Sequence, residues 1–220
     1  MSSLGETLEV LSVNCRGMQD RNKNADVIEY LKKIKSNIYC LQDTHWTDKD
    51  YNYLKTIWGD EIYLSGTKTN ARGVAILIRN NFEFKIINVH KDVNGNYLLL
   101  DILISNEFNL KIITIYAPNQ DNPGFFENLE NLINQTQQAD YIIIAGDFNL
   151  TLNQSLDSFN YVNLNNRRAR TRTLKLIEDN NLIDSYRYLN PTTNAPLTHT
   201  RSSHDPLPDR SKKHKKQKNH

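Results

Sequence analysis

Apolar residues recur along the chain in two rhythms, which predict strands interleaved with helices. Alternation of apolar and polar residues is typical of a strand with one buried face, whereas apolar positions three or four residues apart are typical of an amphipathic helix. Strands are expected, in chain order, over residues 8–14, 38–43, 73–79, 84–90, 97–104, 110–116 and 141–145. Helices are expected over residues 25–34, 51–58, 126–133 and 173–180.

The order of these elements favours one domain with many strands. Residues 93–96, Val-Asn-Gly-Asn, predict a turn between two of the strands. Residues 141–145 form the most continuous apolar run, which predicts a strand at the centre of a sheet. The sequence has no internal repeat, and no linker precedes about residue 202. We therefore expect an α/β or α+β fold in a single domain.

Composition excludes several classes of protein. The 220 residues are 38% hydrophobic, enough for a core, and no apolar run approaches the roughly 18 residues that a membrane helix needs. The first residues lack the basic and then apolar build of a signal peptide. Cys15 and Cys40 are too few for a disulfide scaffold, and we interpret them as buried free thiols of a reduced compartment. We expect an intracellular protein with no membrane partner.

The net charge of +2 hides a contrast between the body of the chain and its end. From Arg201 onward, seven Lys or Arg face two Asp, so the body is slightly acidic and the end is basic. We interpret residues 202–220 as a disordered basic tail. This tail could be a nuclear-localisation or phosphate-binding segment, or it could be the product of an out-of-frame reading.

Four arginines form a separate basic cluster inside the acidic body, at positions Arg167, Arg168, Arg170 and Arg172. As a loop, this cluster could clamp the DNA phosphates that flank a cleavage site. The alternative is the solvated start of a helix, with charges spread by chance. Because the rest of the body is acidic, a nucleic-acid surface would need such a local patch, so we favour the first interpretation.

Polar residues gather where the apolar strands end, at Asn14, Asp43, Tyr116, Asp147 and Asn149. Strand ends that face a crevice are where α/β proteins usually assemble their sites. Taken singly, an Asp or Asn after a strand is more often a turn former or a helix cap than a ligand. Five such residues together favour a site, and carboxylate and carboxamide oxygens suit Mg²⁺ or Mn²⁺ rather than zinc.

Three short motifs carry a resemblance to a known family. They are Leu-Gln-Asp-Thr-His at 41–45, Ile-Tyr-Ala-Pro-Asn at 115–119 and Gly-Asp-Phe-Asn at 146–149, opened by Ser-Val-Asn at 12–14. In this order they resemble the endonuclease/exonuclease/phosphatase superfamily. The order usual in the endonuclease domain of non-LTR (LINE-type) retrotransposon proteins is then followed by residues 170–177, 182–187, 190–191 and 197–198. The expected domain spans residues 7–201.

This resemblance implies a DNase I-like fold, a four-layer sandwich of two mixed β-sheets flanked by helices. It also implies metal-dependent hydrolysis of phosphodiesters with Mg²⁺ or Mn²⁺, DNA as the partner and no small-molecule cofactor. Endonucleases of the retrotransposon branch nick target DNA to prime reverse transcription. We therefore expect a reverse transcriptase domain in a longer parent protein, and action in the nucleus, with the cytoplasm as the alternative.

Catalytic and metal-binding roles are implied position by position by the matching motifs. Asn14 and Asp43 would hold the metal, with Asp43 at the position where the family usually has Glu. Asp147 would orient or deprotonate the attacking water. Asn149 would help to stabilise the charged phosphorane, and Tyr116 would contact the phosphate.

Supporting roles are implied for two more residues. Thr198 matches a threonine of the family's phosphate pocket, with Thr200 as the alternative in the alignment. His45 follows the ligand position in the motif. For His45 we expect a supporting role in the core or around the metal ligands rather than a role in catalysis.

Two departures from the family pattern predict impaired activity. Asp43 is one methylene shorter than Glu, and metal distances tolerate only about ±0.2 Å. The family ends with a Ser-Asp-His segment whose histidine completes the site, whereas Ser203, His204 and Asp205 follow another order. We therefore expect a domain that is truncated at the C-terminus. The alternatives are another phosphoesterase of the superfamily, such as an abasic-site endonuclease, and a catalytically dead nucleic-acid-binding remnant.

Overall fold

The computed structural model describes residues 7–68, 71–136, 138–157 and 166–193. The predicted phosphate-pocket residue Thr198 and the predicted basic tail lie outside these ranges. None of the helices in the described ranges combines the length and the hydropathy that a membrane crossing requires.

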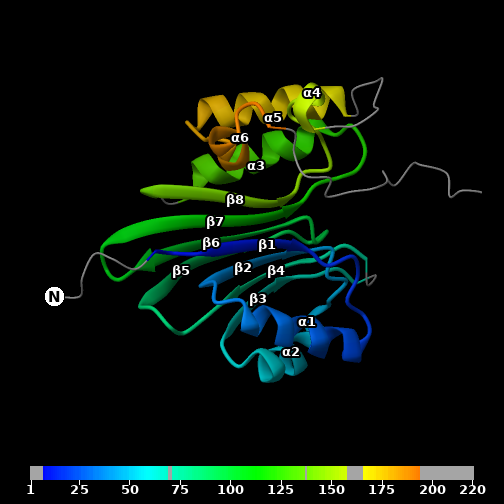
Figure 1. Ribbon diagram of the computed structural model, residues 1–220, viewed down its shortest axis with the longest axis vertical. Coiled ribbons are helices and arrows are strands. Elements are labelled where there is room, and N and C mark those ends of the chain that lie inside the picture. The colour runs from blue at the N-terminus through cyan, green and yellow to red at the C-terminus, as the bar shows by residue number, and fades with distance from the viewer. Residues whose placement is uncertain (1–6, 69–70, 137, 158–165, 194–220) are drawn as a thin grey trace, which may run out of the picture.

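Two four-stranded sheets lie face to face, and helices cover both outer faces (Figure 1). Helices α1 (Arg21–Lys33) and α2 (Tyr51–Trp58) cover the first sheet. Helices α3 (Pro123–Gln135) and α5 (Arg167–Asp179) cover the second sheet. The four-layer sandwich of the DNase I type that the sequence predicts is therefore confirmed.

The first sheet has the strand order β1-β2-β4-β3. Its strands are β1 (Val10–Asn14), β2 (Ile38–Gln42), β3 (Glu61–Ser65) and β4 (Val74–Ile78). β1 and β2 run parallel, and the two other pairs are antiparallel. The hydrophobic pattern does not predict β3, because the strand has five residues and only its Ile and Leu mark a buried face.

The second sheet has the strand order β5-β6-β7-β8. Its strands are β5 (Phe84–Lys91), β6 (Tyr97–Ile104), β7 (Phe108–Tyr116) and β8 (Tyr141–Asp147). β7 and β8 run parallel, whereas β5, β6 and β7 form an antiparallel meander.

The prediction that residues 141–145 form a central strand is wrong for the described sheet. β8 is its edge strand there and pairs with β7. The apolar run has another cause, since both faces of β8 are covered. Ile142 and Ile144 pack with α3 and α5, while Ile143 and Ala145 pack in the layer between the sheets.

Three apolar layers hold the sandwich together. The layer under α1 and α2 is built around Trp46 and Trp58. The layer between the two sheets includes Ile76 and Leu100, and the third, under α3 and α5, includes Phe126 and other side chains. Burial of each large apolar side chain is worth about 1.5–3 kcal/mol. The middle layer therefore fixes the two sheets relative to each other, and the two outer layers fix the helices on the sheets.

Both cysteines are free thiols, as predicted. Cys40 on β2 is buried, whereas Cys15 just after β1 is only partly buried. Burial raises the pKa of each thiol to about 12, so neither is a reactive thiolate at neutral pH.

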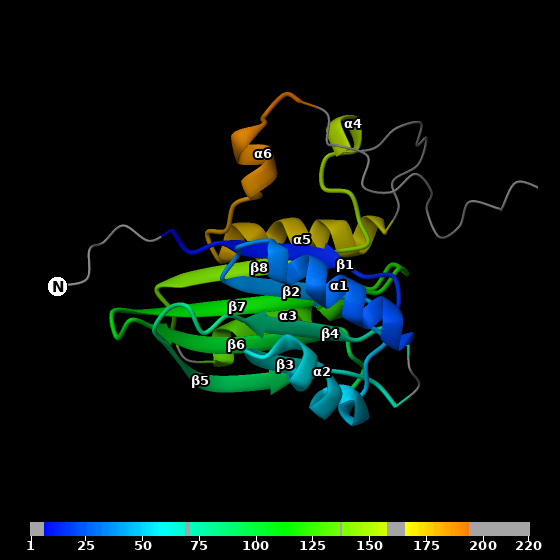
Figure 2. The ribbon, with the colours of Figure 1, turned by 60° about the horizontal axis from the view of Figure 1, so that its bottom comes forward.

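Helix α5 begins earlier than the pattern predicts and contains the arginine cluster, which is therefore helical rather than a loop. Asp121 caps this early start, because its carboxylate accepts the backbone N–H groups of Arg168 (3.3 Å) and Ala169 (2.7 Å). The short helices α4 (Gln154–Asp157) and α6 (Ser185–Leu189) lie beyond α5, away from the sheets (Figure 2). A single 3₁₀ turn, η1 (Asp48–Asp50), leads into α2.

Candidate active site at the strand ends

The two parallel strand pairs bring predicted site residues to one end of the sandwich. In the first sheet Asn14 at the end of β1 pairs with Gln42 at the end of β2. Asp43 is the residue after Gln42, so it lies next to this pair. In the second sheet Tyr116 pairs with Asp147. Between the sheets, Asn14 Nδ2 donates a hydrogen bond of 2.8 Å to Asp147 Oδ2. The carboxyl ends of both sheets therefore meet at these side chains.

A close approach of two strands shapes the Gly-Asp-Phe-Asn motif. Gly146 has a φ of 146°, and a Cβ there would lie 2.1 Å from the carbonyl oxygen of Ile115, so only glycine fits. Asn149 has a φ of 50°, a left-handed conformation that asparagine tolerates. Its backbone N–H donates to Asp147 Oδ1 over 3.0 Å, and its Nδ2 donates to the carbonyl of Ala117 over 2.6 Å. Asn149 thus ties the end of β8 to the loop after β7.

Asp43 and His45 form a close pair at the end of β2. His45 Nε2 lies 3.0 Å from Asp43 Oδ1, and both residues have left-handed backbones, with φ of 52° and 59°. Gly17 packs against the imidazole, because a Cβ on it would lie 3.0 Å from His45 Nδ1. The ring therefore orients the Asp43 carboxylate. This contact agrees with the supporting role expected for His45, which stays a prediction.

The Tyr116 hydroxyl is influenced by the charges of both carboxylates of the site. Its pKa is raised above the usual value, first by burial and then by the negative charges of Asp43 and Asp147, while Arg72 opposes the shift. Tyr116 also pairs with Asp147 across β7 and β8, which places the two residues side by side at the strand ends. The hydroxyl is protonated at neutral pH and can donate a hydrogen bond to a phosphate oxygen.

Two residues near the site, Arg72 and Asn96, are missed by sequence reasoning. Asn96 is buried, and its Nδ2 donates to the carbonyl of Tyr116 over 2.7 Å. Arg72 Nη1 donates to Asn96 Oδ1 over 3.4 Å, and the carbonyl of Arg72 accepts the N–H of His45 over 2.6 Å. The predicted turn at 93–96 is the only signal for Asn96, and Arg72 lies in a loop that no pattern marks.

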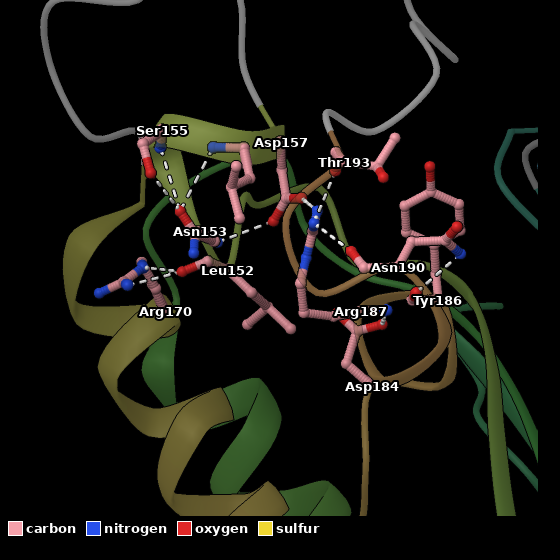
Figure 3. Close-up of polar contacts among 11 residues, drawn as sticks. Leu152, Asn153, Ser155, Asp157, Arg170, Asp184, Tyr186, Arg187, Asn190 and Thr193 are labelled. Carbon is pink, nitrogen blue, oxygen red and sulfur yellow. Dashed lines mark hydrogen bonds and ion pairs between the residues drawn. The ribbon is translucent and has the colours of Figure 1, made fainter.

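The arginine cluster divides into an internal half and an exposed half. Arg172 forms an ion pair with Glu130 of α3. Arg170 donates from Nε and Nη2 to the carbonyl of Leu152 over 2.9 and 2.6 Å (Figure 3). Arg167 and Arg168 are exposed. DNA binding by the cluster stays a prediction, and these two are the members with side chains at the surface.

Oxygen donors that suit a divalent cation lie at the strand ends. The Asp43 carboxylate and the Asn14 amide oxygen come from neighbouring parallel strands. Asn14 Oδ1 accepts the N–H of Arg16 over 3.1 Å and keeps a second lone pair. Mg²⁺ retains several waters, so one carboxylate and one amide oxygen are a sufficient protein share. No cluster of three or more His, Cys, Asp or Glu suited to a metal occurs among the described residues.

Comparison with known proteins gives the family and the fold that this chain shares with them. The model of the endonuclease/exonuclease/phosphatase family matches residues 11–206. The "Transposon TX1 uncharacterized 149 kDa protein" of Xenopus laevis is 24% identical over 192 residues, which are 86% of this chain and 14% of that protein. The chain therefore spans only a small part of this relative's length.

Two solved structures share the fold. An AP endonuclease from Archaeoglobus fulgidus has a TM-score of 0.69 at 20% identity, covering 86% of this chain and 76% of that chain. The AP endonuclease LMAP from Leishmania major has a TM-score of 0.66 at 15% identity, covering 86% of this chain and 71% of that chain. Because the family model matches most of its length, the chain belongs to the endonuclease/exonuclease/phosphatase family.

Proposed function

We propose that this protein is a divalent-metal-dependent endonuclease that nicks DNA and derives from a retrotransposon. The observation that carries the proposal is the hydrogen bond from Asn14 to Asp147, which joins the two sheets beside Asp43, Tyr116 and Asn149. Family membership supports hydrolysis of phosphodiesters, and the relative in transposon TX1 supports the retrotransposon origin. A reverse transcriptase domain in a longer parent protein and action in the nucleus belong to the same proposal.

The phosphate would be held by positive charge and hydrogen-bond donors. Phosphodiester oxygens are anionic and repel a nucleophile, so the site must neutralise them. Mg²⁺ or Mn²⁺, held by Asp43 and Asn14, would supply Lewis-acid charge to one phosphate oxygen. The Tyr116 hydroxyl would donate to another oxygen, and the guanidinium of Arg72, which contacts the Asn96 side chain, would add charge-assisted attraction.

Asp147 is the residue best placed to orient the attacking water. Its Oδ2 accepts a hydrogen bond from Asn14 Nδ2, and its Oδ1 accepts one from the N–H of Asn149. These bonds fix the direction of the carboxylate, which would accept a hydrogen bond from the water. The water oxygen would bond to phosphorus while its proton passes to Asp147. The bond from phosphorus to the 3′-oxygen would break as that oxygen takes up a proton from solvent water. The second amide N–H of Asn149 would donate to the charged phosphorane.

A plasmid-nicking assay tests this function. The purified chain should convert supercoiled plasmid into the open circle when Mg²⁺ or Mn²⁺ is present. Loss of a general base costs about 10²–10⁴-fold in rate, so Asp147→Ala should be slower by that factor. Asp179→Ala, an exposed change on α5, is the matched control and should leave the rate unchanged.

The outcomes of this assay separate the alternatives. Binding of DNA without nicking under either metal would contradict the proposal and favour a non-catalytic remnant. Nicking that requires an abasic site, tested with matched duplexes that carry or lack one, would favour an abasic-site endonuclease. Nicking that persists in Asp147→Ala would show that the active group lies elsewhere.

A further inference from the structure

Asn166, the residue before α5, joins the loops that follow two neighbouring strands. Its side chain is buried, and Nδ2 donates to the carbonyls of Asn149 over 2.8 Å and Asn119 over 3.3 Å. The two N–H bonds of one amide can serve one carbonyl each. Because Asn119 follows β7 and Asn149 follows β8, a single side chain links the two loops that carry the Tyr116 and Asp147 ends of their strands.

The side chain of Asn166 does not cap α5, although the residue stands at the N-cap position. An asparagine at this position ordinarily accepts an N–H of the first turn through its side-chain oxygen. Asn166 has φ 51° and ψ 48°, and its side chain makes no capping bond. Asp121 accepts the first-turn N–H groups instead. With the helix capped by another residue, the amide of Asn166 is left for the two carbonyls.

The loop that leaves β8 is anchored again farther along. Arg170 of α5 donates to the carbonyl of Leu152, and Arg187 of α6 forms an ion pair with Asp157 of α4 (Figure 3). Arg187 also donates to the carbonyl of Thr193 over 2.7 Å. These contacts hold the far part of the loop, whereas the Asn166 amide acts on its first residues, at the carbonyl of Asn149.

We propose that Asn166 is a positioning residue that fixes Asn149 and, through it, Asp147. The inference rests on the proposed function, since it explains how Asn149 and Asp147 are held in position for that reaction. Asn149 contacts Asp147 through its N–H and Ala117 through its side chain, so a shift of its backbone moves both contacts. Misplacement of a catalytic group by about 1 Å can cost on the order of 10²-fold in rate.

The test replaces the amide and keeps the backbone conformation. Asn166→Gly removes the donor, and glycine adopts a left-handed backbone without strain. Asn181→Gly is the matched control, because Asn181 also has a φ of 50° but is exposed just after α5. For plasmid nicking we expect Asn166→Gly to lower kcat by about 10–100-fold and to leave KM near the wild-type value. The control should change neither, and a merely structural role would lower Tm without this kcat effect.

Hydrogen–deuterium exchange provides a readout that does not need activity. Peptides covering residues 147–152 should exchange faster in Asn166→Gly than in the wild type, and at the wild-type rate in Asn181→Gly. Unchanged exchange there, or an unchanged kcat, would overturn the positioning role. A wild-type chain that nicks no DNA would instead overturn the proposed function, and the exchange rates would still decide whether Asn166 holds the loop.

Discussion

Lys111 and Asp101 form a buried ion pair in the second sheet, and removal of one partner should cost more stability than removal of both. They face each other on β7 and β6, with Lys111 Nζ 2.8 Å from Asp101 Oδ1. Lys111 also donates to Thr136 Oγ1 at the end of α3, and Asn88 Nδ2 donates to Asp101 Oδ2 over 3.2 Å. The side chains are only 1% and 8% exposed, so solvent cannot replace a lost partner.

The expected magnitude follows from this burial. Lys111→Met keeps a side chain of similar length and leaves the Asp101 carboxylate buried without its cation. Breaking a buried pair in this way costs about 3–5 kcal/mol. In a domain of this size each kcal/mol lowers Tm by about 2–4 °C, so Tm should fall by about 6–20 °C. The double variant Lys111→Met with Asp101→Leu should recover most of the loss, because no unpaired charge remains.

Urea unfolding followed by circular dichroism provides the measurement. The free energy of unfolding is compared among the wild type, the single variant and the double variant, with equal m-values showing that all three unfold alike. A loss below about 1 kcal/mol in Lys111→Met, the range of surface pairs, would refute the argument from burial. A double variant no more stable than the single one would also refute it.

Three further predictions concern the site and its supports. Asp43→Glu introduces the residue that is usual in the family. It should lower the free energy of unfolding by about 1 kcal/mol, because a left-handed backbone disfavours the longer side chain. Thermal unfolding measures this, and a higher Tm would contradict it. Arg72→Ala should reduce by about one the slope of log binding constant against log salt concentration, measured for DNA binding by fluorescence anisotropy. The exposed control Lys85→Ala should leave this slope unchanged. Equal slopes for Arg72→Ala and the wild type would exclude a phosphate contact by Arg72. Gly146→Ala should fold poorly, because its Cβ would meet the Ile115 carbonyl; expression with a wild-type Tm would show that β7 and β8 can move apart.

Local patterns predicted most of the fold, and contacts between distant segments account for the errors. The bounds of α2 and β6 agree with the prediction. The apolar positions of α2 follow the helical period, and β6 is an apolar run that only Asp101 interrupts. The start of α5 differs, since the cap comes from Asp121, 48 residues before Ala169. The edge position of β8 could not be predicted either, because burial of both faces produces the same apolar run as a central strand.

The same contrast applies to the candidate site. Asn14, Asp43, Tyr116 and Asp147 could be predicted because each ends an apolar strand or directly follows one. Arg72 lies in a loop, and it reaches the site only because the turns of the fold bring that loop beside Asn96. A hydrophobic pattern has no information on such a contact.

Because the candidate site is shared between two sheets, substitutions far from it can change its geometry. The apolar layer between the sheets, with Ile76 and Leu100, works as a spacer, and the 2.9 Å bond from Gln42 Nε2 to Thr114 Oγ1 bridges it with a polar link. A bulkier side chain in that layer would act as a wedge and part the two strand ends. Interior substitutions could thus tune turnover during evolutionary drift while every reacting group stays the same.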